Sequence, residues 1–174
     1  MEFVISEVIR ILEATPAILT AWLGNLPVQW LMANNGEGTW SPYEIVGHLI
    51  HGEKTDWIPR AEIILSDREN REFESFDRFA MFEDSQEKSI NELLDEFNLL
   101  RKGSLERLQV LHPTVSDYQK TGIHPTLGEV TLRQLLSTWA VHDLNHLGQI
   151  AQVMARQYKV EVGPWRGFLE IIDR

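Results

Sequence analysis

The sequence predicts an all-α protein that folds as a four-helix bundle, and three observations favour this fold class. Apolar residues recur at spacings of three and four in four long segments of the chain. No segment alternates apolar and polar residues between hairpin turns, as half-buried strands do. One long connection follows the second segment, which a bundle accommodates. With 174 residues, 43% hydrophobic and 24% charged, residues 1–174 are expected to form a single domain with its own core.

The first predicted helix spans approximately residues 4–23, where aliphatic residues and one tryptophan form a single face. Thr15 and Pro16 lie in its middle. Because proline has no backbone N–H and is preferred in the first turn of a helix, we expect this pair to kink or restart the helix. Gly24 to Pro27 ends it, and a turn-rich linker follows.

The second predicted helix has a strong start signal in the sequence "SPYE". Ser41 is the expected N-cap, Pro42 occupies the first helical position, and Glu44 completes a capping box. Apolar residues continue at helical spacing to about residue 65. Pro59 is expected to kink this segment by removing one backbone hydrogen bond, but we predict one continuous helix.

The charged segment 66–85 contains four phenylalanines, namely Phe73, Phe76, Phe79 and Phe82. At roughly 20 residues it is longer than the usual structureless loop of a compact domain. One interpretation is a partly ordered cover over a site. The other is a solvated connector whose phenylalanines plug the edge of the core.

The third predicted helix begins near Asp84 and Glu87, which fit the spacing of a capping pair, and it ends at His112-Pro113. After a turn-rich connection, the capping-box pair Thr131 and Gln134 starts a fourth helix that extends to about residue 158. A short helix is expected at Trp165 to Ile172 near the end of the chain. These elements complete the predicted bundle.

The charge and the residue types limit the partners and the metal ligands that this protein can have. A formal net charge of -10 argues against nucleic acid as a partner, because nonspecific nucleic-acid binding depends on clustered lysine and arginine. The sequence has no cysteine, so a bound metal would need histidine, aspartate, glutamate or water as ligands. This composition is compatible with a reducing compartment.

The first residues do not resemble a signal peptide, because Glu2, Glu7 and Arg10 interrupt their apolar run. No window approaches the ~18 consecutive apolar residues that a transmembrane helix needs. We therefore expect a cytoplasmic protein without a membrane partner.

The segment "TWAVHDLNHLGQIAQVM" contains the first candidate site residues, His142 and His146. Four residues apart on a helix, both imidazoles project from one face and can reach a common point. They also continue a row of apolar residues, so they are expected to face the interior. This spacing fits a metal site, but it also fits two core histidines that are satisfied by other hydrogen bonds.

A catalytic metal site usually has three protein ligands and one open position, so a further ligand is needed from another helix. The sequence "GHLIHGE" offers His48 and His51. At 100° per residue, His48 lies with Ile45 and Gly52 on one side of the second helix, whereas His51 points about 60° away from that group. His48 is therefore the predicted third ligand.

Several polar residues near these histidines are candidates for supporting roles. Glu53 and Asp56 can supply a catalytic base or support a ligand, and we predict Glu53 as the catalytic residue. The alternative for both is an ion pair with Lys54 or Arg60. Asp143 follows a histidine by one residue, so it is expected to point away from the site, as a surface, capping or ligand-supporting group. Gln149 is expected to form part of the polar wall of a pocket.

The sequences "TWSPYEIVGHLIHGE" and "HPTLGEVTLRQLLSTWAVHDLNHLGQI" together resemble the DinB-like superfamily of damage-inducible and YfiT-like metal-dependent proteins. The family pattern of one histidine in the second helix and two in the fourth falls on His48, His142 and His146. The resemblance implies a four-helix bundle that binds a divalent metal, nickel or zinc above all, with manganese or iron as alternatives. It also implies a homodimer, and in some branches a transferase or isomerase that uses a low-molecular-weight thiol such as bacillithiol, mycothiol or glutathione.

These residues allow three interpretations of the histidines. In the first, a metal at the three histidines activates water or a thiol, and the protein is a transferase or hydrolase acting on a small electrophilic substrate. In the second, the protein is a non-catalytic, stress-related module that binds a ligand or metal, and the metal is structural. In the third, the histidines are a core cluster without metal.

Overall fold

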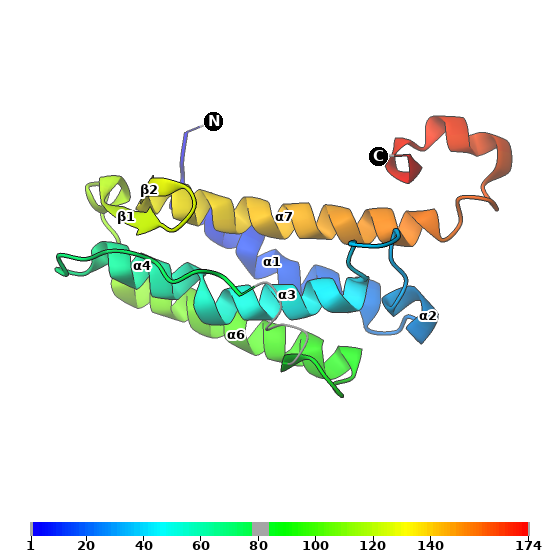
Figure 1. Cartoon of the computed structure of the whole chain (residues 1–174), viewed down its shortest axis with the longest axis horizontal. Helices are drawn as coiled ribbons and strands as arrows, with labels where there is room; N and C mark the ends of the chain where they lie inside the picture. Colours follow the sequence, from blue (N-terminus) through cyan, green and yellow to red (C-terminus); the bar gives the residue numbers. More distant parts are fainter. Residues whose placement is uncertain (1, 78–83, 174) are drawn as a thin grey trace.

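The computed structural model describes residues 2–77 and 84–173. Its long helical elements pack as a four-helix bundle, which confirms the predicted fold class (Figure 1). They are α1 (Ile5–Leu23), α3 (Pro42–Thr55) continued by α4 (Trp57–Leu65), α6 (Ile90–Leu111) and α7 (Leu132–Arg156). The short elements are α2 (Val28–Leu31), the 3-10 turns η1 (Asp117–Gln119), η2 (Gly163–Phe168) and η3 (Glu170–Ile172), and the strands β1 (Thr121–His124) and β2 (Gly128–Thr131).

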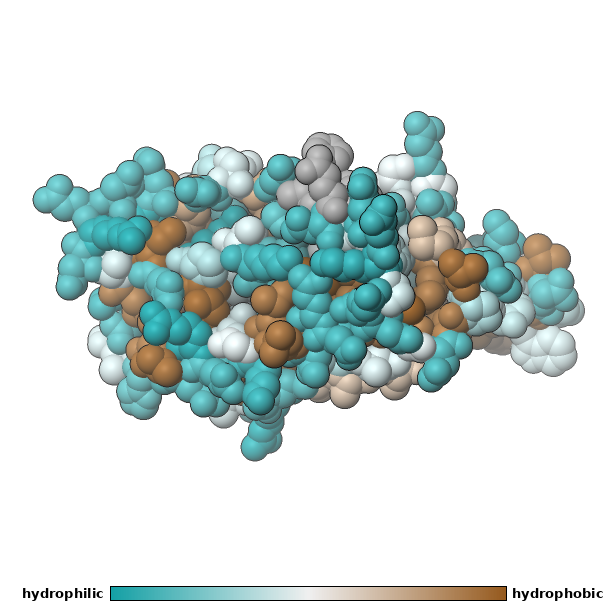
Figure 2. All heavy atoms as spheres, turned by 90° about the horizontal axis from the view of Figure 1, so that it is seen from below, coloured by the Kyte–Doolittle hydropathy of each residue, from teal (hydrophilic) through white to brown (hydrophobic). Residues whose placement is uncertain are grey.

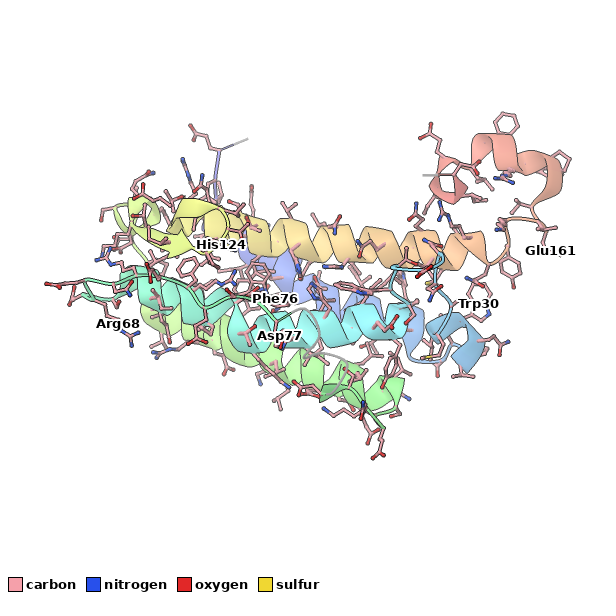
Figure 3. The ribbon with its side chains drawn as sticks, in the orientation of Figure 1. Trp30, Arg68, Phe76, Asp77, His124 and Glu161 are labelled. Carbon is pink, nitrogen blue, oxygen red and sulfur yellow. The ribbon has the colours of Figure 1, made fainter. Side chains whose placement is uncertain are left out.

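The helices do not simply alternate in direction along the chain. The colour gradient in Figure 1 shows that α1 and α7 run one way, whereas α3 and α6 both run the other way. Because α3 and α6 are parallel, the connection between α4 and α6 has to return along the bundle. Figure 3 shows this return, from Arg68 at one end to Phe76 and Asp77 beside the middle of the bundle.

The core is divided by a layer of polar residues. One apolar cluster contains Leu12, Ile64, Leu105 and Trp139, and the other contains Leu19, Leu49, Phe97 and Ile150. On each long helix, the residues between the two clusters are polar residues or, in α1, a polar residue followed by a proline. They are Thr15 and Pro16 in α1, His51, Glu53 and Asp56 at the α3–α4 junction, Arg101 in α6, and His142, Asp143 and His146 in α7. The outer face seen in Figure 2 is largely hydrophilic, with hydrophobic residues scattered over it.

Capping boxes start three of the long helices, and two were predicted. Ser41 with Glu44 starts α3, and Thr131 with Gln134 starts α7. The predicted start of the third helix is wrong. Its capping box is Ser89 with Glu92, where the Glu92 carboxylate accepts the Ser89 N–H at 2.7 Å. Glu87 has a φ of 67°, a left-handed conformation that cannot lie inside an α-helix.

The second predicted helix is interrupted, so the prediction of one continuous helix is wrong. α3 ends at Thr55 and α4 begins at Trp57, with Asp56 between them at φ -103° and ψ -67°. The cause is Pro59, which offers no N–H to the carbonyl of residue 55 and crowds it with its ring. By contrast, α1 continues through Pro16 as one helix and does not restart there.

The hairpin of β1 and β2 was not predicted, and it anchors part of the connection between α4 and α6. Phe73 N–H donates to the Ile123 carbonyl, and Ile123 N–H donates to the Arg71 carbonyl, both at 2.9 Å. Phe73 is buried in the first core cluster. Both interpretations of segment 66–85 therefore hold in part, because Phe73 fills the core edge and Phe76 lines a cavity described below. Phe79 and Phe82 lie outside the described residues.

The predicted C-terminal helix at Trp165 to Ile172 is instead two short 3-10 turns, η2 and η3, separated by Leu169. This segment folds back beside the end of α7 (Figure 1). Arg156 Nε donates to the Ile172 carbonyl at 2.9 Å, which fixes η3 to α7. Among the described helices, none has both the length and the apolar composition for crossing a bilayer.

Candidate metal centre

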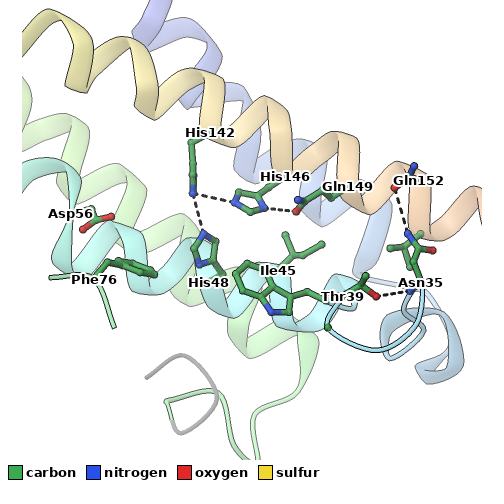
Figure 4. Close-up of a pocket in the computed structure, with 13 residues that line it drawn as sticks. Asn35, Thr39, Ile45, His48, Asp56, Phe76, His142, His146, Gln149 and Gln152 are labelled. Carbon is green, nitrogen blue, oxygen red and sulfur yellow. Dashed lines mark hydrogen bonds between the residues drawn. The ribbon is translucent and has the colours of Figure 1, made fainter. Parts of the chain in front are cut away.

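The three predicted metal ligands meet in one place. His48 projects from α3, and His142 and His146 project from successive turns of α7 (Figure 4). His142 Nε2 lies 3.0 Å from His48 Nε2 and 3.1 Å from His146 Nε2, and one ligand atom of each residue lies within 4.8 Å of the others. Metal–nitrogen bonds of zinc are about 2.0–2.1 Å, which places neighbouring ligand nitrogens about 3 Å apart. The spacing therefore fits a bound divalent ion.

The hydrogen bonds of the imidazoles also fit a cation. His146 Nδ1 lies 2.7 Å from Gln149 Oε1, and this acceptor assigns the ring proton to Nδ1 and leaves a lone pair on Nε2. His142 Nε2 faces two other nitrogens, but a single proton on it can satisfy only one of them. A cation satisfies all three lone pairs at once.

The local electrostatics keep His142 and His146 neutral, as metal ligation requires. Burial lowers the pKa of His142 to about 3, with further contributions from His146, His48 and Arg101. Burial is also the main cause that lowers the pKa of His146, against the Gln149 hydrogen bond and the charge of Asp143. Neutral nitrogen donors are therefore available at neutral pH.

The histidines lie in the wall of a cavity of about 540 Å³. The rings of Trp40 and Phe76 flank His48, with centroids 4.8 and 5.4 Å from its ring. Gln149 lines the cavity, as predicted, and the other lining residues are Asn35, Gly38, Thr39, Ile45, Asp56, Gln152 and Val153. The size and the mixture of aromatic and carboxamide groups suit a small-molecule ligand.

Asp56 is the only carboxylate among the described residues that line this cavity. The sequence allows Asp56 to be a base, a ligand-supporting group or an ion-pair partner of Lys54 or Arg60, and the pair with Arg60 forms at 2.6 Å. Burial raises the pKa of Asp56 to about 6, although the charge of Arg60 opposes the shift. The break at Asp56 between α3 and α4 thus provides an acidic group with a pKa near neutrality.

Glu53, the predicted catalytic residue, does not line the cavity. Its side chain is fully buried and bonded to Arg101, not to Lys54 or Arg60. Glu53 Oε1 accepts hydrogen bonds from Arg101 Nη2 and from Trp139 Nε1, both at 2.9 Å. The structure therefore places Glu53 beside the site, in a buried cluster of charges.

Asp143 belongs to the same cluster, so the surface and capping interpretations of this residue are wrong. It is fully buried and bonds Arg101 Nη1 at 2.6 Å and Arg101 Nη2 at 3.0 Å. Sequence reasoning missed Arg101. The available signal was its position on the core stripe of α6, four residues after Phe97 and four before Leu105, where an unpaired arginine would be costly.

His51, the alternative to His48, is buried but lies outside the histidine cluster. Its ring packs against Phe76, with centroids 4.8 Å apart. The structure thus places His48, and not His51, with the two histidines of α7.

Two solved structures resemble most of the chain. One is YfiT from Bacillus subtilis, described as a probable metal-dependent hydrolase with an unusual four-helix bundle topology. It has a TM-score of 0.76 and 20% sequence identity, over 90% of this chain and 91% of that one. The other is TT2238, a four-helix bundle protein, with a TM-score of 0.54 and 24% identity over 83% of this chain and 95% of that one. Both likenesses support the fold.

No curated protein matches the sequence. The sequence model of the DinB superfamily matches residues 11–150, a range that contains the three histidines and the helices that present them. Because the match covers most of the chain, the protein belongs to the DinB superfamily.

Proposed function

We propose that the protein is a metal-dependent hydrolase acting on a small uncharged molecule, with His48, His142 and His146 as ligands of a divalent ion. The observation that carries the proposal is the convergence of the three Nε2 atoms on a cavity that also contains Asp56. YfiT, described as a probable metal-dependent hydrolase, supports the reaction class by its similar fold. A donor set of imidazoles favours zinc or nickel over manganese, which prefers oxygen ligands.

The chemistry of this site divides between the ion and the side chains around it. A divalent ion bound there would lower the pKa of a water molecule towards neutrality and polarise a substrate carbonyl. Asp56 is the general base, because its carboxylate lines the cavity and has a pKa of about 6. Arg60 bonds Oδ1 of Asp56, so Oδ2 accepts the proton. Gln149 holds the Nδ1 proton of His146 and thereby keeps Nε2 directed at the ion.

The cavity wall indicates the kind of substrate. The carboxamides of Asn35, Gln149 and Gln152 line the side formed by α7 and the loop before α3, and Trp40 and Phe76 provide flat apolar surface. Described lining residues include no lysine or arginine to bind an anion. An uncharged ester, amide or lactone with an apolar portion fits these groups best.

The test compares the wild-type protein with His146→Ala and Asp56→Asn. The protein is purified without chelator, supplied with zinc or nickel, and analysed for metal and for hydrolysis of a panel of uncharged esters, amides and lactones. We expect stoichiometric metal in the wild type and in Asp56→Asn, loss of metal in His146→Ala, and hydrolysis by the wild type alone. Equal metal in all three would contradict the ligand assignment. Metal binding with no turnover would favour a structural metal, and turnover only with an added thiol would favour a transferase.

A further inference from the structure

In the buried cluster of Glu53, Arg101 and Asp143, the N–H donors of the arginine can be counted against the carboxylate oxygens that accept them. Arg101 uses all five of its N–H groups. Nε and one Nη2 hydrogen go to Glu53, one hydrogen each from Nη1 and Nη2 goes to Asp143, and the last goes to the Leu12 carbonyl. Both oxygens of Asp143 therefore accept from Arg101. The arginine has no donor left.

Glu53 is saturated on one oxygen only. Oε1 accepts from Arg101 and Trp139, whereas the buried Oε2 has no hydrogen-bond partner among the described residues. Two carboxylates and one guanidinium give the cluster a net charge of -1 in a region from which water is largely excluded. A buried carboxylate oxygen without a donor is costly, so Oε2 is expected to accept a hydrogen bond in the functional protein.

A complementary group on the metal centre is His142; the buried Nε2 of His51 also has no hydrogen-bond partner among the described residues, but His51 lies outside the histidine cluster. When the Nε2 lone pair of His142 faces an ion, Nδ1 carries the proton, and this buried Nδ1 has no acceptor among the described residues. His142 lies one turn after Trp139, the residue that donates to Glu53. Asp143, the residue after His142, bonds the same Arg101 guanidinium that Glu53 bonds, so His142 adjoins the cluster. An acceptor without a donor and a donor without an acceptor therefore lie in the same buried layer of the core.

We propose that Glu53 is a positioning residue of the metal centre, whose Oε2 accepts the Nδ1 proton of His142 directly or through one water. This inference rests on the proposed function, because it needs an ion at the three histidines. The hydrogen bond fixes the ring of His142 with Nε2 towards the ion, and the net negative charge of the cluster favours a divalent cation. Metal-ligating histidines generally depend on such an acceptor, and its loss typically weakens metal binding 10- to 100-fold.

The experiment measures the dissociation constant for zinc by chelator competition in the wild type, Glu53→Gln and Asp143→Asn. Glu53→Gln keeps the shape, but an amide at Oε2 turns a donor towards the Nδ1 proton. Asp143→Asn removes the same charge from the cluster, although both of its oxygens are already held by Arg101. We expect a dissociation constant raised about 10- to 100-fold in Glu53→Gln and a clearly smaller rise in Asp143→Asn. Leu108→Ala, a core residue of the first apolar cluster, controls for lost stability and should lower the melting temperature without changing zinc affinity.

Equal weakening in Glu53→Gln and Asp143→Asn would mean that the cluster acts through charge alone and would overturn the positioning role. An unchanged zinc affinity in Glu53→Gln overturns it too, while leaving the proposed function intact. If the wild type binds neither zinc nor nickel, both the proposed function and the positioning role of Glu53 are wrong.

A second measurement of the positioning role needs no variant. In the zinc-loaded wild type, proton-detected nitrogen NMR should show a slowly exchanging Nδ1–H on His142, and a rapidly exchanging or absent proton would contradict the hydrogen bond.

Discussion

Arg101 Nη1 donates a hydrogen bond at 2.9 Å to the carbonyl oxygen of Leu12, the acceptor that Pro16 leaves open in α1. In an α-helix the carbonyl of residue 12 normally accepts from the N–H of residue 16, which proline does not have. The guanidinium on α6 takes that place. The proline therefore does not interrupt α1, and the bond ties α1 to the polar layer of the core.

Replacing Arg101 by methionine is expected to lower the free energy of unfolding of the metal-free protein by about 3–5 kcal/mol. The reason is that Glu53 and Asp143 would remain buried without a counter-charge. Urea denaturation measures the change. Lys102→Met is the matched control, because this neighbouring side chain is 74% exposed and its loss should change stability by less than about 0.5 kcal/mol. A loss under about 1 kcal/mol in Arg101→Met would show that the cluster contributes little.

Gln149→Leu should weaken metal binding about 10- to 100-fold, because the leucine cannot hold the Nδ1 proton of His146. Isothermal titration with zinc measures the affinity. Gln152→Leu removes the other glutamine of the cavity, one turn further along α7, and should leave zinc affinity within about threefold, since hydrogen bonds to a ligand act locally. The assignment of the His146 tautomer fails if the two variants bind zinc equally well.

The rate of hydrolysis is expected to rise with pH and to level off above an apparent pKa near 6. The pKa of Asp56 is raised, so its ionised form, the base, predominates only above about pH 6, and activity is lost as the pH falls below that value. The lowered pKa of His142, about 3, keeps that ligand unprotonated over the same range. Activity could fall at low pH because Asp56 is protonated or because protonated histidines release the metal. Metal content measured at pH 5 separates these two causes. An Asp56→Asn variant with the same pH limb as the wild type would exclude Asp56 as the base.

Gly122→Ala should destabilise the protein by about 1–3 kcal/mol through overpacking. A Cβ at this position would lie 2.5 Å from the ring of Phe73 and 3.0 Å from Ile64, where the hairpin holds the returning chain against the core. Gly103→Ala is the control. Its Cβ would meet nothing within 4 Å, and it lies inside α6, where alanine is favoured over glycine by roughly 0.5–1 kcal/mol. The melting temperature should therefore fall in Gly122→Ala and rise in Gly103→Ala. A rise in both variants would contradict the packing of Phe73 on Gly122.

The parts of the fold that could be predicted depend on residues close together in the sequence. The capping boxes at Ser41 and Thr131 are local, and so is the spacing of His142 and His146. The third helix start was misplaced because Asp84 with Glu87 fits the same spacing as the true pair, Ser89 with Glu92. Sequence spacing does not reveal that Glu87 has a positive φ.

The buried charges could not be predicted in the same way. Arg101 bonds Asp143 and Glu53, which lie 42 and 48 residues away in the sequence. No pattern in the residues around Arg101 indicates these partners. Asp143 was expected to point away from the histidines, which it does, but the space it points into is the interior and not solvent. The direction of a side chain follows from helical geometry, whereas the neighbour that it meets depends on how the helices pack.

The parallel course of α3 and α6 has a consequence for how this protein can diversify. A bundle with alternating helices needs only tight turns between neighbours, but here the chain must travel back along the bundle before α6 begins. That obligatory return carries Phe76 past His48. Most residues of the return from 66 to 77 are exposed, so their sequence can change with little cost to the helices. The topology therefore brings a largely exposed segment past the histidines, and under the proposed function this segment is where substrate preference can change at little cost to the bundle.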